Sequence, residues 1–240
     1  MRLYKLNKLI SSTEEEYLVY KKHKDDWNKI SRYTMLTKFF IEKYKDRLNW
    51  HYVSVFQKLS ESFIEKYKDR VHWLSVSAYQ PLSESFIEKF KDKVNWYSIS
   101  VNQILSESFI EKYKDYVNWS CISKYQTLSE MFIEKYKYKV DWEWISAMQS
   151  LSEPFIIKYK NKLNWTNICA YQKLSESFIT KNKDNVDWYY VSKYQKLSEP
   201  FIIKFKDKVD WHYISRYQKH LSPEFKNKYK HLKDPNSFYL

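Results

Sequence analysis

Tryptophan recurs along this chain at a constant interval, and that interval constrains the fold more than any other feature of the sequence. A constant period of about 20–50 residues is typical of tandem-repeat architectures. The sequence therefore predicts an array of copies of one small element, rather than the one or two globular domains that 240 residues would otherwise suggest. Nine tryptophans lie 23 residues apart without an insertion or a deletion: Trp27, Trp50, Trp73, Trp96, Trp119, Trp142, Trp165, Trp188 and Trp211.

The copy 59-LSESFIEKYKDRVHWLSVSAYQP-81 predicts two short helices. Ser60 is a favourable N-cap of the first helix, because its hydroxyl can accept a free backbone N–H. We expect this helix to run for about two to three turns, with Lys66 and Lys68 in its last turn, where positive charge is favourable. Its predicted buried face consists of Phe63, Ile64 and Tyr67.

The second helix of each copy begins at the tryptophan. The preceding residue is Asn or Asp in the repeats, apart from His72, and Asn and Asp are both good N-caps. Counted from the tryptophan, an aliphatic residue at +3, a serine at +4 and a glutamine at +7 follow in nearly every copy, which is the spacing of one helical face. We expect the Trp, Phe and Ile positions to form the core, and the small serine to let another helix come close.

These patterns predict an all-α fold, an α-solenoid of about nine 23-residue, two-helix repeats with degenerate terminal caps and about two-thirds helix. Strands are disfavoured, because period-two alternation is missing and Glu and Lys are abundant. The chain has no glycine, whereas average usage is about 7%. Its helix–helix turns must therefore avoid positive φ, or place Asn, Asp or Lys there.

The ends of the array depart from the repeat. We expect a capping helix in 1–12, nine repeats in 13–219, a C-terminal half-repeat cap in 220–233 and a loose tail in 234–240. In the half-repeat, Lys226 replaces the isoleucine of the first helix and no tryptophan follows. Terminal repeats are expected to be atypical, because one side of each faces water.

Three recurring segments carry a resemblance to a known family: LSE-F-I, KYKD-V-N/D-W and IS-YQ, as in 174-LSESFITKNKDNVDWYYVSKYQ-195. Over about residues 13–230, the chain resembles tandem repeats of uncharacterised proteins of large DNA viruses that infect amoebae. The resemblance implies an α-helical repeat protein of viral or protist type, and it implies no activity.

The two cysteines and the lack of a long apolar segment predict an intracellular protein. Cys121 and Cys169 lie two repeats apart, beyond the reach of a disulfide if successive helices advance by about 8–10 Å, so we expect reduced thiols. The N-terminal apolar run is too short for a signal peptide, and no window approaches the roughly 18 apolar residues of a membrane span. We expect no membrane association and a cytoplasmic location, in the host cell if the chain is viral.

Four positions of the second helix change freely between copies: +1, +2, +5 and +8 from the tryptophan. Solenoids bind partners along extended surfaces, so these positions are candidates for contact with a protein or peptide. The alternative is drift on an unused solvent face, but exposed aromatic residues tend to mark interaction sites. The last two copies combine aromatic and basic residues, so we expect the main contact there and favour an acidic partner. The predicted contact residues are Tyr52, Trp144, Tyr189, Tyr190, Lys193, Lys196, His212, Tyr213, Arg216 and Lys219.

The charge of the chain supports a second hypothesis. The net charge is +13, and lysines near the ends of the first helices form ladders that could hold the phosphates of a nucleic acid. The alternative is a solvated face, which interleaved acids such as Glu65 and Asp69 and the scarcity of arginine favour. The lysines of the nucleic-acid hypothesis are Lys66, Lys68, Lys89, Lys91, Lys112 and Lys114.

Catalysis has little support in the sequence. The six histidines do not recur at ligand spacing, the cysteines do not join them, and a glycine-rich phosphate loop is not possible. His212, near Tyr213 and Arg216, is the one local cluster that could be considered. We therefore expect a non-enzymatic scaffold that binds a macromolecule, with no metal, cofactor or small-molecule substrate. A protein partner is the first choice, nucleic acid the second, and a structural or self-assembling role the third.

Overall fold

The computed structural model describes residues 18–19, 21–24, 26–33 and 35–233, and every regular element in this part of the chain is a helix. The first helices of the repeats have six residues each: α4 (Lys38–Lys43), α6 (Glu61–Lys66), α8 (Glu84–Lys89), α10 (Glu107–Lys112), α12 (Glu130–Lys135), α14 (Glu153–Lys158), α16 (Glu176–Lys181), α18 (Glu199–Lys204) and α20 (Pro223–Lys228). The second helices have seven residues each: α3 (Trp27–Tyr33), α5 (Trp50–Phe56), α7 (Trp73–Tyr79), α9 (Trp96–Asn102), α11 (Trp119–Tyr125), α13 (Trp142–Met148), α15 (Trp165–Tyr171), α17 (Trp188–Tyr194) and α19 (Trp211–Tyr217). A 3-10 helix, η1 (Lys230–Lys233), follows α20.

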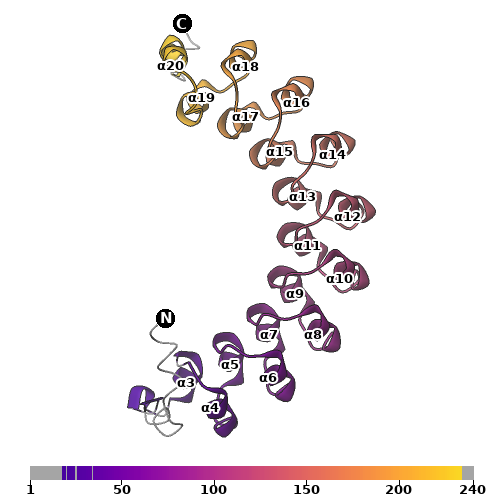
Figure 1. Cartoon of the computed structure of the whole chain (residues 1–240), viewed down its shortest axis with the longest axis vertical. Helices are drawn as coiled ribbons and strands as arrows, with labels where there is room; N and C mark the ends of the chain where they lie inside the picture. The colour runs from indigo at the N-terminus through magenta and orange to yellow at the C-terminus, as the bar shows by residue number, and fades with distance from the viewer. Residues whose placement is uncertain (1–17, 20, 25, 34, 234–240) are drawn as a thin grey trace. The chain divides into compact units, whose positions relative to one another are not determined.

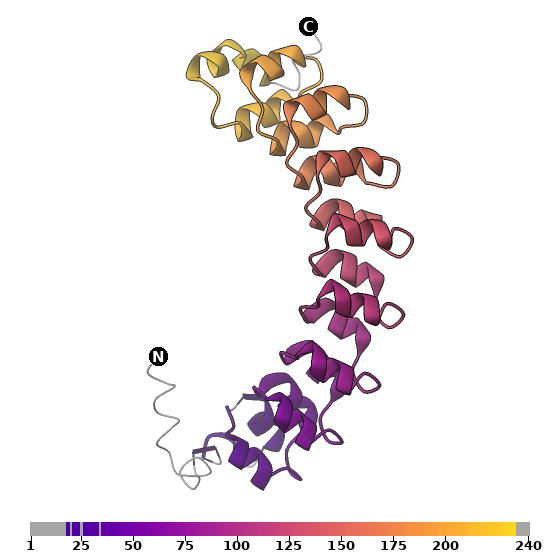
Figure 2. The ribbon, with the colours of Figure 1, turned by 45° about the vertical axis from the view of Figure 1, so that its right-hand side comes forward.

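The chain forms two compact halves, Met1–Asn118 and Trp119–Leu240. In the N-terminal half, the second helices α3, α5, α7 and α9 lie in one row and the first helices α4, α6, α8 and α10 in another (Figure 1). The C-terminal half has the same arrangement, with α11 to α19 in one row and α12 to α20 in the other (Figures 1 and 2). Within each half, successive second helices pack directly on one another. Such stacked rows confirm the predicted α-solenoid.

Side-chain caps explain why such short segments are helical. Ser60 Oγ accepts the N–H of Phe63, and an equivalent serine begins each later first helix. The Asp141 carboxylate likewise accepts two N–H groups at the start of α13, as predicted for the second helices. His72, which precedes α7, makes no such bond. A helix of six or seven residues is too short to be stable alone, so these caps and the packing around them decide whether it forms.

The first helices are shorter than the sequence predicts. α6 ends at Lys66, and Lys68 lies in the turn that follows, so the prediction of Lys68 in the last helical turn is wrong. The carbonyl of Tyr67 accepts the N–H groups of both Arg70 and Val71, which winds the chain into a further turn instead of a longer helix. The two helices therefore contribute 13 of the 23 residues of a repeat, less than the predicted two-thirds.

The loops between helices need no glycine. Among the described residues, positive φ occurs at Lys24 (φ 48°). Between a second helix and the next first helix the chain is extended, as at Gln80 (ψ 137°) and Ser83 (ψ 154°). Any L-residue can adopt extended and right-handed turn conformations. This agrees with the prediction that the turns avoid positive φ.

Aliphatic and phenyl side chains fill the core. Phe63, Ile64 and Tyr67 are buried, as predicted, and so are the Phe and Ile residues of the later first helices. The tryptophans are half-buried instead, apart from the buried Trp211, so the prediction that they form the core is only partly right.

In seven of the described repeats the tryptophan closes the turn that joins the two helices of the repeat. The indole of Trp73 stacks on Phe86 of the next first helix, with ring centroids 6.4 Å apart. Its Nε1–H donates to the carbonyl of Lys68 at 2.8 Å. An indole N–H needs a partner when it is partly buried, and this geometry leaves the ring at the edge of the core. The same donor and carbonyl positions recur at Trp50, Trp96, Trp142, Trp165, Trp188 and Trp211.

A ladder of buried glutamines at +7 joins successive repeats. The Gln172 Nε2 amide donates to the carbonyls of Ser146 (3.1 Å) and Gln149 (2.8 Å), and its Oε1 accepts the N–H of Leu151 (3.0 Å). All three partners belong to the end of the preceding second helix or its loop, where backbone groups have no intrahelical partner. The glutamine therefore supplies the C-terminal cap of the repeat before it. The three bonds recur at Gln80, Gln103, Gln149, Gln195 and Gln218.

Serine and glutamate provide two further links between repeats. Ser77, at +4, donates to the carbonyl of Trp73 (2.7 Å) and accepts the N–H of Asn95 (2.9 Å) in the next repeat. Glu61, at the start of α6, accepts the N–H of Ser83 (2.6 Å) in the next repeat. The serine is fully buried, so it both allows close approach, as predicted, and bonds the two helices together.

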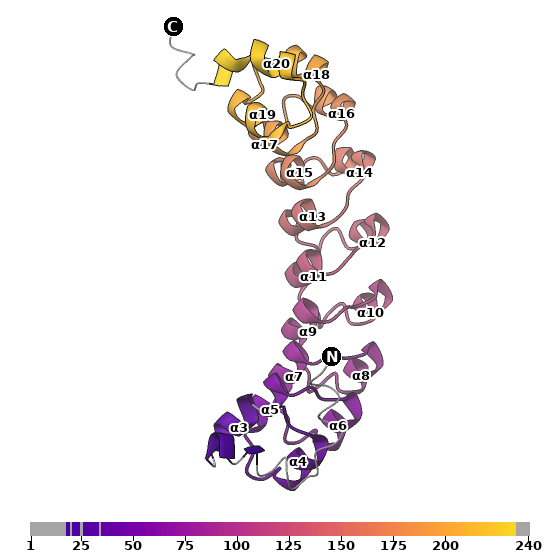
Figure 3. The ribbon, with the colours of Figure 1, turned by 60° about the vertical axis from the view of Figure 1, so that its left-hand side comes forward.

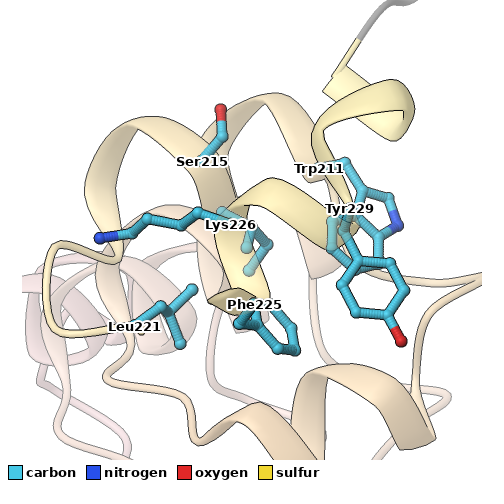
Figure 4. A pocket seen from close by; sticks show the side chains of 7 residues that line it. Trp211, Ser215, Leu221, Phe225, Lys226 and Tyr229 are labelled. Atoms are coloured by element: carbon cyan, nitrogen blue, oxygen red, sulfur yellow. The ribbon is translucent and has the colours of Figure 1, made fainter. Parts of the chain in front are cut away.

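The C-terminal half-repeat covers the last second helix. η1 and α20 pack near α19 (Figure 3), and Tyr229 lies beside Trp211 (Figure 4) with ring centroids 5.1 Å apart. This covering explains why Trp211 is buried. Behind the rings, Leu221, Phe225 and Lys226 help to line a cavity of about 10 Å³, room for about one water molecule.

Some predictions fall outside the described residues. These are the capping helix in 1–12, the beginning of the first repeat and the tail in 234–240.

Replacement of Gln172 by leucine should lower the free energy of unfolding by about 3 kcal/mol or more. Three buried backbone groups would lose their partner, each at a cost of about 1–3 kcal/mol. Urea denaturation followed by far-ultraviolet circular dichroism measures the change. Lys173→Ala, at the exposed next residue, is the matched control and should change stability by less than about 0.5 kcal/mol. Equal effects of the two variants would contradict a stabilising role for the ladder.

Candidate partner-binding surface

The variable position +1 pairs neighbouring repeats. At five of the described +1 positions the side chain meets the N-cap side chain of the next repeat, as when Ser120 donates to Asp141 (2.8 Å). In the following pair, the Asn164 amide donates to the Glu143 carboxylate (2.9 Å). Part of the variation at +1 therefore reflects complementarity between repeats, with donors facing acceptors. Further contacts of this type join Asn28 to Asn49, His51 to His72 and Thr166 to Asp187.

The variable position +2 leans on the preceding repeat. The Lys124 ammonium lies 3.8 Å from the ring centroid of Trp144, and the Arg32 guanidinium lies 5.8 Å from that of Tyr52. Second helices pack side by side, so a residue on the flank of one helix meets the helix before it. The aromatic residues at +2 were expected to be exposed, and the structure corrects this: Tyr52, Trp144, Tyr190 and Tyr213 are half-buried.

A row of exposed aromatic and large apolar side chains lies at +6, the last residue of the second helices. This position belongs to the recurring IS-YQ segment, and no contact was predicted there from the sequence. Asn102 occupies it in one repeat. We call the row the exposed stripe: Phe56 and Tyr79 in the N-terminal half, and Tyr125, Met148, Tyr171, Tyr194 and Tyr217 in the C-terminal half, with exposed fractions from 42% to 65%.

The stripe ends in an aromatic cluster on α17 and α19, which we call the tyrosine–lysine patch. The Lys193 ammonium lies 4.9 Å from the ring centroid of Tyr194, 5.4 Å from that of Tyr213, 5.6 Å from that of Tyr217 and 5.7 Å from that of Tyr189. The hydroxyls of Tyr189 and Tyr213 are 2.8 Å apart, and this bond raises the pKa of Tyr213. The interaction with Tyr194 raises the pKa of Lys193. Cation–π contacts thus hold the lysine over the rings.

The patch unites several of the predicted contact residues and adds two that were missed. Tyr189, Tyr190, Lys193 and Tyr213 come together as expected, and Tyr194 and Tyr217 join them. Tyr190 stacks on Tyr194 with ring centroids 6.0 Å apart, and Tyr213 stacks on Tyr217 with centroids 5.7 Å apart. The sequence did hold a signal for these two residues. A tyrosine precedes the +7 glutamine in most copies, although the glutamine is buried and the tyrosine is exposed.

Basic side chains surround the tyrosine–lysine patch. The Arg216 guanidinium lies 5.8 Å from the ring centroid of Tyr217. The carboxylates of Asp187 and Asp210, which begin the two helices, are directed at backbone N–H groups as N-caps. The patch therefore has a positive character. The other predicted basic residues of this segment, Lys196, His212 and Lys219, are exposed.

Two predicted contact residues lie elsewhere. Trp144 is on α13, separated from α17 by α15, and Tyr52 is on α5 in the N-terminal half. Neither contributes to the tyrosine–lysine patch.

The predicted lysine ladders are partly neutralised by acids of the preceding repeat. The Glu88 carboxylate hydrogen-bonds to Lys112, which raises the pKa of Lys112 and lowers that of Glu88. Lys68, Lys91 and Lys114 are exposed, and the first two form no ion pair within the described ranges. The pairing favours a solvated face over a phosphate-binding one. The bridged pairs are Lys66–Glu42 (2.6 Å), Lys89–Glu65 (2.5 Å) and Lys112–Glu88 (2.5 Å).

The described residues contain no group of three or more His, Cys, Asp or Glu side chains that could hold a metal ion. None of the described helices is long and apolar enough to cross a membrane. Cys121 and Cys169 are buried free thiols.

Comparison of the chain with models of protein families, with curated proteins and with solved structures found no match. The resemblance to repeats of large DNA viruses therefore stays a prediction from the sequence. The function must be argued from the surface itself.

Cys169 should resist alkylation by iodoacetamide in the folded chain at about pH 8, because only the thiolate reacts. The thiol is fully buried, and this desolvation raises its pKa from 9.0 to about 11. Since the folded pKa is the higher one, the stabilising contribution of the neutral thiol is present below about pH 9 and is lost as the pH rises towards about 11.

Mass spectrometry of the alkylated peptides measures this reactivity. Both cysteines should react once guanidinium unfolds the chain, and Cys169→Ser identifies the signal. Rapid modification of Cys169 in the folded protein would contradict the buried position of the thiol.

Proposed function

We propose that this chain is a non-enzymatic scaffold that binds an acidic segment of a protein partner along the part of the exposed stripe that lies in the C-terminal half, with the main contact at the tyrosine–lysine patch. The observation that carries the proposal is the recurrence of large apolar side chains at +6, where they are exposed. Packing within the chain leaves about 42% to 65% of each of these side chains exposed. Exposed apolar groups in a row are typical of interaction surfaces.

The spacing of the stripe suits an extended segment. Helices that pack on one another are about 8–10 Å apart, and an extended chain advances about 3.3 Å per residue. About every third side chain of a partner could therefore meet the next ring of the stripe.

The positive charge of the tyrosine–lysine patch favours an acidic partner. Lys193 and Arg216 lie among tyrosines whose hydroxyls can donate hydrogen bonds to carboxylates. Tyrosine and arginine are also the residues most enriched at binding hot spots. An acidic segment with apolar side chains satisfies both properties of the patch. A double-stranded nucleic acid would use the charge alone, whereas the bases of a single strand could also stack on the tyrosine rings.

Tyr194→Ala and Tyr217→Ala should each weaken binding of an acidic peptide by about tenfold or more, about 1.4 kcal/mol. Peptides selected from a displayed random library supply the ligand, and isothermal titration calorimetry measures Kd. Both tyrosines are only about half buried, so the melting temperature should fall much less than for a core substitution. Lys173→Ala on the same half of the chain is the matched control and should bind like the parent.

Three results would overturn the proposal. One is a selected peptide pool that is not acidic, and another is affinity that the tyrosine variants leave unchanged. The third is stronger binding to single-stranded DNA or RNA, with affinity that falls steeply between about 50 and 200 mM salt, which would favour the nucleic-acid function.

A further inference from the structure

Two histidines of adjacent repeats face each other in the N-terminal half. His51 lies in α5, and His72 is the residue before α7. Their Nδ1 atoms are 3.3 Å apart, and their rings meet edge to face with centroids 4.7 Å apart. The hydroxyl of Ser75 lies 2.8 Å from Nδ1 of His72 and 3.4 Å from Nδ1 of His51. Two imidazole nitrogens and one hydroxyl oxygen, from two successive repeats, thus lie within 3.4 Å of one another.

The pair departs from the repeat at His72. The +1 position of His51 varies widely, and in other repeats it holds residues such as Ser120, the apolar Leu74 and His212. His72, by contrast, stands where the other repeats have Asn or Asp, and its side chain makes no cap bond to α7. Its ring is directed at His51 and Ser75 instead.

The separation of the two nitrogens fits a shared metal ion. For metal–nitrogen bonds of about 2.0–2.1 Å in a tetrahedral sphere, two nitrogen ligands lie about 3.3–3.4 Å apart. The two Nδ1 atoms already have this tetrahedral distance, which suits Zn²⁺. In the square-planar or tetragonal spheres of Cu²⁺ and Ni²⁺, neighbouring nitrogens lie about 2.9 Å apart, so the rings would approach by about 0.4 Å. With both protons on Nε2, the two Nδ1 lone pairs are free to act as ligands.

We propose that His51 and His72 form a binding site for a late first-row divalent metal ion, such as Cu²⁺, Ni²⁺ or Zn²⁺, between two repeats. Imidazole suits these ions, whereas Ca²⁺ and Mg²⁺ prefer oxygen ligands. The Ser75 hydroxyl and water complete the coordination sphere. Affinity should follow the order of Cu²⁺ above Ni²⁺ and Zn²⁺.

The site links metal binding to the stability of the solenoid. Its two imidazoles come from successive repeats, so a bound ion cross-links α5 and α7. An ion that binds the folded chain and not the unfolded one raises the melting temperature by mass action. No third His, Cys, Asp or Glu completes a closed cage among the described residues, so coordination positions stay open to water or to a donor from a bound partner.

The test compares the parent chain with His72→Asn, which restores the residue type of the other repeats, and with His51→Asn, which places at +1 the residue type of Asn28. The parent should bind Cu²⁺, measured by isothermal titration calorimetry, and electron paramagnetic resonance should show two nitrogen ligands. Each variant should bind at least about tenfold more weakly and should lose the metal-dependent rise in melting temperature. Circular dichroism checks that both variants fold.

His212→Asn is the matched control, because it removes an exposed histidine outside the pair, and it should bind like the parent. Parent-like binding by His72→Asn, or a single-nitrogen spectrum for the parent, would overturn the proposal. Failure of this site would leave the peptide-binding function untouched, because the tyrosine–lysine patch lies in the other half of the chain.

Discussion

Every repeat in this chain depends on hydrogen bonds from its neighbour, because a helix of six or seven residues cannot persist alone. The glutamine at +7 caps the preceding second helix, the serine at +4 binds the next N-cap, and the glutamate of the first helix binds the next loop. These bonds join residues 18, 21, 22, 23 and 26 positions apart. They can coexist only if the period is constant, which is the physical reason that no insertion interrupts the tryptophans.

Contacts between repeats also explain part of the sequence variation at the second helices. Positions +1 and +2 vary, yet they meet the neighbouring repeat, so a change at one of them is matched by a change at its contact. The Glu143–Asn164 pair and the Lys124–Trp144 pair illustrate this matching. Variation alone is therefore a poor guide to a binding surface in a solenoid. A better guide to a binding surface is a large apolar side chain that recurs at one position although the chain leaves about half of it exposed.

Two features of the structure are candidates for binding. One is a row of recurring exposed side chains, and the other is a histidine pair between two repeats. The exposed stripe keeps rings in water and gathers at the tyrosine–lysine patch, where Lys193 is held over four tyrosines. The His51–His72 pair departs from the repeat at His72 and brings two imidazole nitrogens together. Both arise where successive second helices pack side by side, since this packing places residues that are far apart in sequence within contact distance.

Local patterns in the sequence determined the repeat, the two helices of each copy, their N-caps and the buried Phe and Ile positions, because these depend on spacing within a few residues. The sequence also identified Tyr189, Tyr190, Lys193 and Tyr213 as candidates. Only the tertiary structure decided that the tryptophans sit at the edge of the core, that +2 leans on the previous helix and that Tyr194 and Tyr217 are exposed. It also decided that ladder lysines such as Lys112 are bridged by acids. These properties depend on contacts between repeats about 23 residues apart, and a single helix does not reveal which of its flanks its neighbour will cover.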